Sequence, residues 1–232
     1  MPKSSRRVAG FTESVIREMT RLAEKYGALN LAQGFPDFPP PPELVAAAHQ
    51  ALREGHHQYS ITWGARSLRE ALAARISRWW RRPIDPETMI TVTCGATEGL
   101  VAALMSILDP GDEVIIFEPF YENYIPAAIL ASAVPRFVTL RPPDFRLDPD
   151  MLKAAVTRRT KAVVVNTPNN PTGRVLTREE LEAIASLCIE HDLILVTDGF
   201  GNFVQVSPSV KDILGFSPED LIGHSATEFI HP

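Results

Sequence analysis

The sequence alternates between short apolar runs rich in β-branched residues and longer segments with helical periodicity, and this alternation restricts the possible folds most. The runs lie at 89–93, 113–117, 135–140, 161–166 and 193–198. Between them, in segments such as 97–108 and 177–191, apolar residues recur at intervals of three and four. Thr177 followed by Glu180 predicts a capping box at the start of the second of these helices. Apolar strands separated by helices predict an α/β fold, with a mostly parallel sheet flanked by helices.

Composition and charge restrict the class of partner. The 232 residues are 45% hydrophobic, which fits the core of one large domain, or of one domain and a fragment. The net charge of −5 gives no electrostatic reason to expect nucleic acid or an anionic membrane as the main partner. The one basic cluster with aromatic residues, RWWRRP at 78–83, is interpreted as the end of an amphipathic helix, with nucleic-acid contact as a remote alternative.

Cysteine and histidine usage indicates neither a disulfide scaffold nor a metal site. Cys94 and Cys188 lie far apart, and the six histidines lack ligand spacing. A reducing, cytoplasmic location is therefore expected. The segment 1–19 carries positive charge without a following apolar run, so it does not resemble a signal peptide, and no stretch has the length of a membrane span.

The stretch TVTCGATEGL predicts a strand that ends in a turn at Gly95, Ala96 and Thr97, after which a helix begins. Backbone N–H groups and the helix dipole converge at such a turn, so it can bind an anion, most naturally a phosphate. An ordinary strand-to-helix turn built from small residues is the alternative interpretation.

Two further motifs follow predicted strands. Tyr121, in EPFYENY, lies at the carboxyl end of the sheet, where α/β proteins bind ligands, and its ring could stack on a flat cofactor. A simple core aromatic is the alternative. In NTPNNPTG, Asn170 before Pro171 predicts a tight turn, with a cis peptide as one option, that presents an amide to a ligand.

Asp198 is an acidic residue at the end of an otherwise apolar strand. A carboxylate held there needs a partner that offsets its desolvation, and a protonated pyridine nitrogen would serve. The alternative is a solvated turn aspartate before Gly199.

Five motifs in this order resemble the first half of a class I/II aminotransferase, a fold-type I pyridoxal phosphate enzyme. The resemblance covers about residues 8–198 and is nearest to the aspartate/kynurenine-type branch. The motifs are LNLAQGFPDFPPPPELV, HHQYSITWGARSLREALA, VTCGATEGL, EPFYENY and NTPNNPTGRVLTREELEAIASLC.

The resemblance implies pyridoxal 5′-phosphate as the cofactor, amino acids and 2-oxo acids as substrates, and a homodimer. Each site residue takes the role of the family position that it matches. Gly95, Ala96 and Thr97 would bind the cofactor phosphate. Around the pyridine ring, Tyr121 would stack on its face, Asn170 would bind its ring oxygen and Asp198 would pair with its nitrogen. Gly34 would border the substrate, and Tyr59 would reach the phosphate of the neighbouring subunit.

After Asp198 the sequence departs from the family pattern. The family continues Asp-Glu-x-Tyr, whereas this chain continues with Gly199, Phe200 and Gly201. Lys211 is the only lysine after Asp198, and no arginine follows. The lysine that holds the cofactor covalently and the arginine that binds the substrate carboxylate are therefore expected to be lacking. We expect a truncated chain without catalytic residues that binds the cofactor weakly, without a covalent bond, and does not transaminate.

Residues 198–232 resemble the start of a PAS sensor domain, with a glycine turn followed by LGFSPEDLIG. Ser217, Pro218 and Asp220 have the pattern of a helix start. We therefore expect a chimera with two parts, an aminotransferase-like region at 1–198 and a short α+β, PAS-like fragment at 199–232. A divergent aminotransferase tail, a sensor or interaction module, and a chain without activity are the alternatives.

Overall fold

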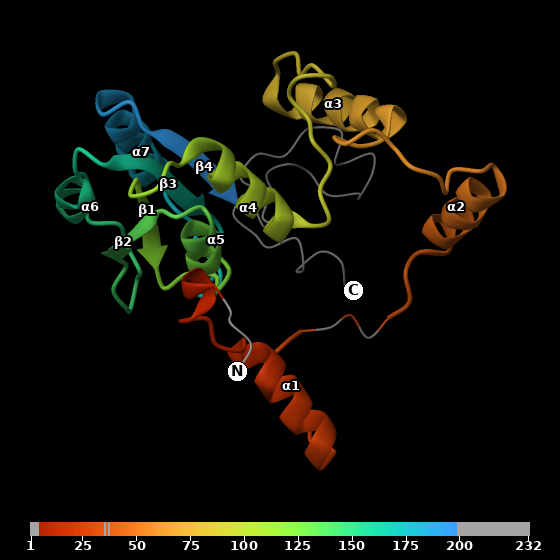
Figure 1. Ribbon diagram of the computed structural model, residues 1–232, viewed down its shortest axis with the longest axis horizontal. Coiled ribbons are helices and arrows are strands. Elements are labelled where there is room, and N and C mark those ends of the chain that lie inside the picture. Colours follow the sequence, from red (N-terminus) through yellow and green to blue (C-terminus); the bar gives the residue numbers. More distant parts are fainter. Residues whose placement is uncertain (1–4, 35, 37, 199–232) are drawn as a thin grey trace. The chain divides into compact units, whose positions relative to one another are not determined.

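Four parallel strands form the sheet of the computed structural model, in the order β2-β1-β3-β4 (Figure 1). Their bounds are β1 Glu113–Glu118, β2 Val134–Thr139, β3 Thr160–Asn166 and β4 Ile194–Asp198. The apolar runs predicted all four of these strands to within one residue at each end. The parallel α/β fold is thus confirmed.

The structure describes residues 5–198 with the exception of 35 and 37. The chain divides into two units, Met1–Ala65 and Arg66–Pro232. The PAS-like segment 199–232 lies outside the described residues, so its interpretation stays a prediction.

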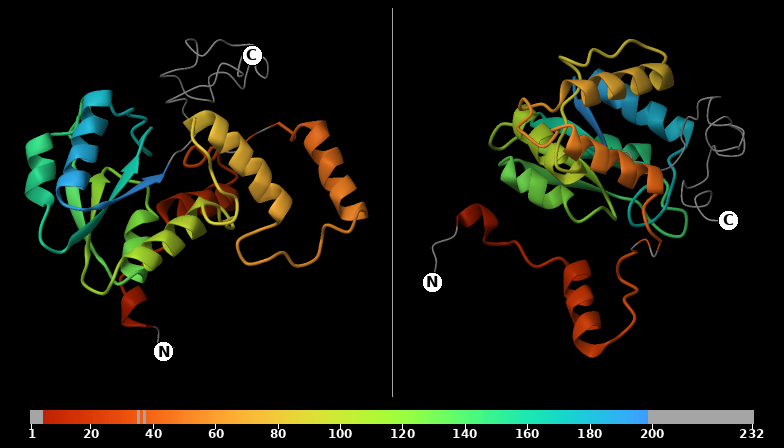
Figure 2. Two further views of the ribbon diagram at one scale, coloured as in Figure 1. Left: turned by 90° about the horizontal axis from the view of Figure 1, so that it is seen from above. Right: turned by 90° about the vertical axis from the view of Figure 1, so that its right-hand side faces the viewer.

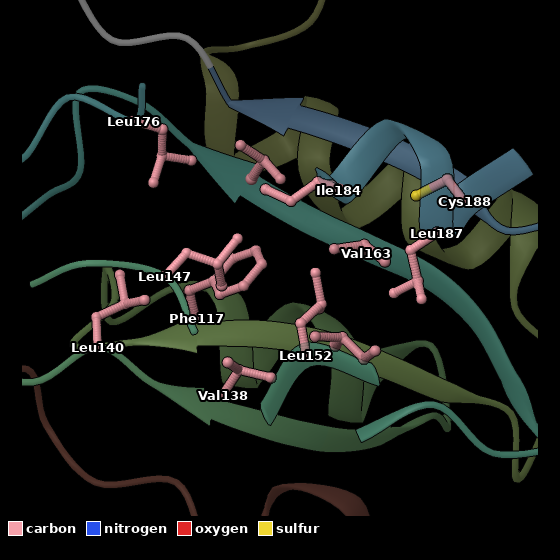
Figure 3. Packing of buried hydrophobic residues seen from close by; sticks show 12 residues of the cluster. Phe117, Val138, Leu140, Leu147, Leu152, Val163, Leu176, Ile184, Leu187 and Cys188 are labelled. Carbon is pink, nitrogen blue, oxygen red and sulfur yellow. The ribbon is translucent and has the colours of Figure 1, made fainter. Parts of the chain in front are cut away.

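Helices cover both faces of the sheet because neighbouring side chains of a strand point to opposite sides. Val114 and Ile116 pack in one cluster with residues of α4 and α5, whereas Ile115 and Phe117 pack in another with residues of α6 and α7. Figure 3 shows the second cluster, and Figure 2 shows the helical layers. The helices of this unit are α3 Arg66–Trp80, α4 Ala96–Ile107, α5 Tyr124–Leu130, α6 Pro149–Ala155 and α7 Arg178–Glu190.

Local sequence determines how several of these helices begin and end. The capping box before α7 is confirmed, because Glu180 N–H donates to Thr177 Oγ1 at 3.2 Å and Thr177 N–H donates to Glu180 Oε2 at 2.6 Å. Helix α3 ends at Trp80, inside the basic aromatic cluster, as predicted. The guanidinium of Arg82 lies 5.2 Å from the centre of the Trp80 ring.

The predicted strand at 89–93 is wrong: the structure has no strand there. A β-branched run becomes a strand only where another strand offers its backbone groups, and none of the described strands pairs with this segment. The end of this segment forms local hydrogen bonds instead. Gly95 N–H donates to the Thr93 carbonyl oxygen at 2.8 Å, and the Thr93 hydroxyl donates to the Gly95 carbonyl oxygen at 3.0 Å.

A buried carboxylate at the amino end of β1 contacts β2 and the segment before β3. Glu113 begins β1 and is 1% exposed. Its two oxygens accept hydrogen bonds from Arg159 Nη2 and Thr157 Oγ1, both at 2.7 Å, and Arg136 Nε lies 3.6 Å away. Burial acts to raise the pKa of Glu113, but these hydrogen bonds and positive charges outweigh it, so its pKa lies below the ordinary value.

The first unit contains the short helix η1 Arg6–Val8 and the helices α1 Val15–Tyr26 and α2 Pro42–Arg53. Helix α1 ends because Gly27 adopts a left-handed conformation, with φ of +59°. Helix α2 begins with Pro42, whose fixed φ suits a first helical position. None of the helices in the described part of the chain has both the length and the apolar character needed to cross a bilayer.

Candidate functional site

The predicted site residues of the second unit gather at the carboxyl edge of the sheet. Tyr121 follows β1, Asn170 follows β3 and Asp198 ends β4. The strands are parallel, so their carboxyl ends meet at one edge, where α/β proteins bind ligands.

The turn before α4 presents an uncapped helix N-terminus. Gly95 occupies the N-cap position with φ of +84°, a backbone conformation that is unfavourable for residues other than glycine. Within the described part of the chain, no side-chain capping hydrogen bond forms at this N-terminus, and Gly95, Ala96 and Thr97 are exposed. The Glu98 carboxylate accepts a hydrogen bond from the N–H of Cys94, which precedes the turn. The N–H groups of the first turn therefore remain suited to an anion.

Asn123 joins this turn to Tyr121. Its Nδ2 donates to Thr97 Oγ1 at 2.9 Å and to the Tyr121 hydroxyl oxygen at 2.9 Å. The two acceptors come from different elements, since Thr97 lies in α4 and Tyr121 lies in the segment after β1. One side-chain amide thus fixes the predicted stacking ring beside the predicted phosphate turn.

Tyr124 joins the same segment to Asp198. Its hydroxyl donates to Asp198 Oδ2 at 2.7 Å, and its ring meets that of Tyr121 edge-on, with 5.9 Å between centres. Burial and, next, the hydrogen bond to Asp198 raise the pKa of Tyr124 well above its ordinary value. Tyr124 therefore remains a neutral donor to the carboxylate.

Asn166 connects Asp198 to the Asn-Pro turn. Its Nδ2 donates to the Asp198 carbonyl oxygen at 2.8 Å, and its Oδ1 accepts from the Asn170 N–H at 2.6 Å. The Asn170–Pro171 peptide is cis, which confirms one option of the sequence prediction. Asn169 Nδ2 also donates to the Pro119 carbonyl oxygen at 3.2 Å, so the turn is bonded to the segment after β1.

A continuous series of contacts thus links four predicted site residues through three that the sequence interpretation missed. The missed residues are Asn123, Tyr124 and Asn166, and each had a signal in the sequence. Asn123 and Tyr124 lie within EPFYENY, two and three residues after Tyr121, and Asn166 is the last residue of a buried strand. In order, the series is Thr97, Asn123, Tyr121, Tyr124, Asp198, Asn166 and Asn170.

Gly34 and Tyr59 belong to the first unit and are exposed there. Their suggested roles beside the substrate and at the neighbouring subunit's phosphate stay predictions.

The residues of this edge fit pyridoxal 5′-phosphate. The uncapped start of α4 suits its phosphate, and the ring of Tyr121 suits its flat pyridine. Asp198 is half-buried and, among the described residues, its carboxylate accepts from the neutral Tyr124 hydroxyl and forms no ion pair. A protonated ring nitrogen would complete the surroundings of that carboxylate.

The chain belongs to the family described as aminotransferase class I and II, whose family model matches residues 26–220. The match includes the turn before α4, the Asn-Pro turn and Asp198. It also continues beyond Asp198 into the segment whose resemblance to a PAS domain stays a prediction.

Curated relatives carry aminotransferase names. The chain is 43% identical over 194 residues to a probable N-succinyldiaminopimelate aminotransferase of Mycobacterium tuberculosis, which covers 83% of this chain and 49% of that protein. It is 41% identical over 207 residues to human kynurenine–oxoglutarate transaminase 1, with 84% and 49% covered. The chain thus spans about half the length of these curated relatives.

Solved structures agree with this membership. The N-succinyldiaminopimelate aminotransferase of Mycobacterium tuberculosis superposes with a TM-score of 0.80 at 42% identity, covering 84% of this chain and 52% of that chain. Thermus thermophilus aspartate aminotransferase with maleate gives 0.81 at 37% identity, covering 90% and 57%.

Proposed function

We propose that the chain carries the cofactor-binding part of a pyridoxal phosphate-dependent aminotransferase, which transfers an amino group from an amino acid to a 2-oxo acid. The observation that carries the proposal is the continuous series of contacts from Thr97 to Asn170 at the carboxyl edge of the sheet. It spans a helix N-terminus suited to an anion, a stacking ring and a carboxylate without an ion pair in the described chain.

The residues at the carboxyl edge of the sheet each have a proposed role in binding the cofactor. When bound, the cofactor supplies an electron sink that stabilises negative charge at the substrate's α-carbon. The N–H groups at Gly95, Ala96 and Thr97 bind its phosphate, and Tyr121 covers the face of its ring. Asp198 holds the proton on the ring nitrogen, because a carboxylate in contact with that nitrogen favours its charged form.

Other residues orient the ring and border the substrate. The Asn170 amide binds the ring oxygen, and Gly34 leaves room beside the substrate. Tyr59 reaches the phosphate site of a second copy, so the working assembly is a homodimer. A substrate of the aspartate/kynurenine type is supported by relatives that include human kynurenine–oxoglutarate transaminase 1 and Thermus thermophilus aspartate aminotransferase.

We further propose that this chain on its own binds the cofactor weakly and without a covalent bond, and does not transaminate. The support is in the sequence, where Lys211 is the only lysine after Asp198 and no arginine follows it. Transamination needs a group that carries a proton to and from the α-carbon and a cation that orients the substrate carboxylate.

The test is titration of the purified chain with pyridoxal 5′-phosphate, followed by borohydride reduction, peptide mapping and assays with amino donors and 2-oxo acids. We expect saturable binding that dialysis reverses, weaker binding by Asp198→Ala, and no turnover above that of the free cofactor. Absence of saturable binding would overturn the cofactor proposal. One stoichiometrically modified lysine, or turnover that Asp198→Ala abolishes, would overturn the proposal of an inactive, non-covalent chain.

A fusion with a PAS-type sensor or interaction module is the second candidate, favoured by LGFSPEDLIG within 199–232. Sequencing the coding DNA across codons 190–240 tests it. An open frame that continues into the remaining strands of a PAS domain is the expected result for a fusion, and a frame shift or stop would contradict it.

A further inference from the structure

Asn123 occupies a capping position without acting as a cap. It is the N-cap residue of α5, a position where asparagine ordinarily accepts a hydrogen bond from the first turn of the helix. Its side chain forms no such bond. Instead its Nδ2 reaches Thr97, 26 residues away in sequence, and the hydroxyl of Tyr121.

The direction of these bonds determines what Thr97 can do. A side-chain amide nitrogen has two hydrogens and no acceptor capacity, so it donates to both hydroxyl oxygens. The Thr97 oxygen therefore accepts from Asn123, which leaves the Thr97 hydroxyl hydrogen to donate elsewhere. Thr97 lies in the exposed first turn of α4, so this hydrogen is available to the same anion as the backbone N–H groups.

We propose that Asn123 is a positioning residue that makes the Thr97 hydroxyl a donor to the cofactor phosphate. The inference rests on the proposed cofactor site and adds to it a residue that acts through Thr97. Through its second hydrogen, Asn123 also holds the Tyr121 ring in a fixed place relative to that phosphate.

The experiment compares pyridoxamine 5′-phosphate with pyridoxamine as ligands of the full chain. Neither has a carbonyl group, so neither bonds covalently to lysines. The ratio of their dissociation constants, measured by calorimetry or fluorescence, reports the contribution of the phosphate alone. The variants are Asn123→Ala, Asn123→Asp and Thr97→Val, with Tyr121→Phe as the matched control that removes the other acceptor of Asn123 and keeps the ring.

Asn123→Ala should reduce the phosphate preference about fivefold, the size expected for one hydrogen bond. Asn123→Asp should reduce it more, because a carboxylate of the same shape only accepts and so turns the Thr97 hydroxyl away from the phosphate. In a Thr97→Val background the alanine change should have no further effect, and the aspartate change should retain only the effect of its charge. Tyr121→Phe changes a residue of the cofactor site itself, so it should weaken both ligands, and by the same factor, because its ring stacks on the pyridine that they share.

A purely structural role for Asn123 predicts a different pattern. Asn123→Asp would then change the phosphate preference only through its charge, and equally in the wild-type and Thr97→Val backgrounds, because it keeps both hydrogen bonds with their direction reversed. Asn123→Ala would weaken both ligands equally. Either of these two results would overturn the inference about Asn123 without affecting the proposed cofactor site. Additive effects of Asn123→Ala and Thr97→Val would do the same. If the wild type shows no preference for the phosphorylated ligand, the proposed cofactor site fails and the inference fails with it. Should the alanine variant unfold, Asn123→Ser retains a residue suited to the N-cap and takes its place.

Discussion

Each end of the sheet carries a carboxylate, and the surroundings of the two carboxylates differ in burial and in charge. At the amino end, Glu113 is buried and bonded to Arg159 and Thr157, with Arg136 close by. At the carboxyl end, Asp198 is half-buried and accepts from the neutral hydroxyl of Tyr124. Glu113 is already neutralised by the chain's own arginines, whereas Asp198 has no cation among the described residues.

The difference separates stability from ligand binding. A buried carboxylate without partners costs free energy, so one that serves the fold is paired with cations as Glu113 is. A carboxylate that serves a ligand must keep an open position for the ligand's charge. The amino end should therefore contribute to the free energy of unfolding and the carboxyl end to cofactor affinity.

Asp198→Asn should produce the largest change, and it should fall on affinity. The amide keeps the shape and can still accept from Tyr124, but it lacks the charge that pairs with a ring nitrogen. Loss of one charge-assisted hydrogen bond should weaken pyridoxamine 5′-phosphate binding by about 10- to 100-fold. Calorimetric titration measures this, and unchanged affinity would remove Asp198 from the cofactor site.

Glu113→Ala should produce the next largest change, and it should fall on stability. The substitution removes two hydrogen bonds and leaves a cavity at the start of β1, although Arg159 and Arg136 are exposed enough to be hydrated. We expect the free energy of unfolding in urea to fall by about 2–3 kcal/mol. Affinity for pyridoxamine 5′-phosphate should stay within about twofold of the wild type. A large loss of affinity in a folded variant would break the comparison between the two ends.

The contribution of Glu113 should also depend on pH. Its pKa in the folded chain lies below the ordinary value of 4.5, so the stabilisation is present above that value and is lost as the pH falls through the folded-state pKa. The difference in urea midpoint between the wild type and Glu113→Gln should therefore be constant near neutral pH and shrink below about pH 4.5. A difference that grows on acidification would mean that Glu113 is not stabilised as a carboxylate.

Tyr124→Phe should produce the smallest change. It removes the hydroxyl that donates to Asp198 and keeps the buried ring beside Tyr121. The half-buried carboxylate can bind water instead, so the free energy of unfolding should change by less than about 1 kcal/mol. Affinity for pyridoxamine 5′-phosphate should fall about threefold to fivefold, because Asp198 is held less firmly. An effect as large as that of Asp198→Asn would mean that Tyr124 binds the ligand directly.

Much of the fold followed from local pattern. The apolar runs at 113–117 and 161–166 predicted strands because both of their faces are buried, and Thr177 with Glu180 predicted the start of α7. The run at 89–93 is also rich in β-branched residues but forms no strand. Pairing depends on a neighbouring strand, which sequence periodicity does not contain.

The sequence by itself determined the chemical groups of the site: the glycine turn at Gly95, the ring of Tyr121, the amide of Asn170 and the carboxylate of Asp198. Only the tertiary structure decided how they are connected. Asn123 bonds to a threonine 26 residues away and Tyr124 to an aspartate 74 residues away. Such bonds depend on which strand ends become neighbours in a parallel sheet, and that order, β2-β1-β3-β4, arises from long-range pairing and not from local spacing.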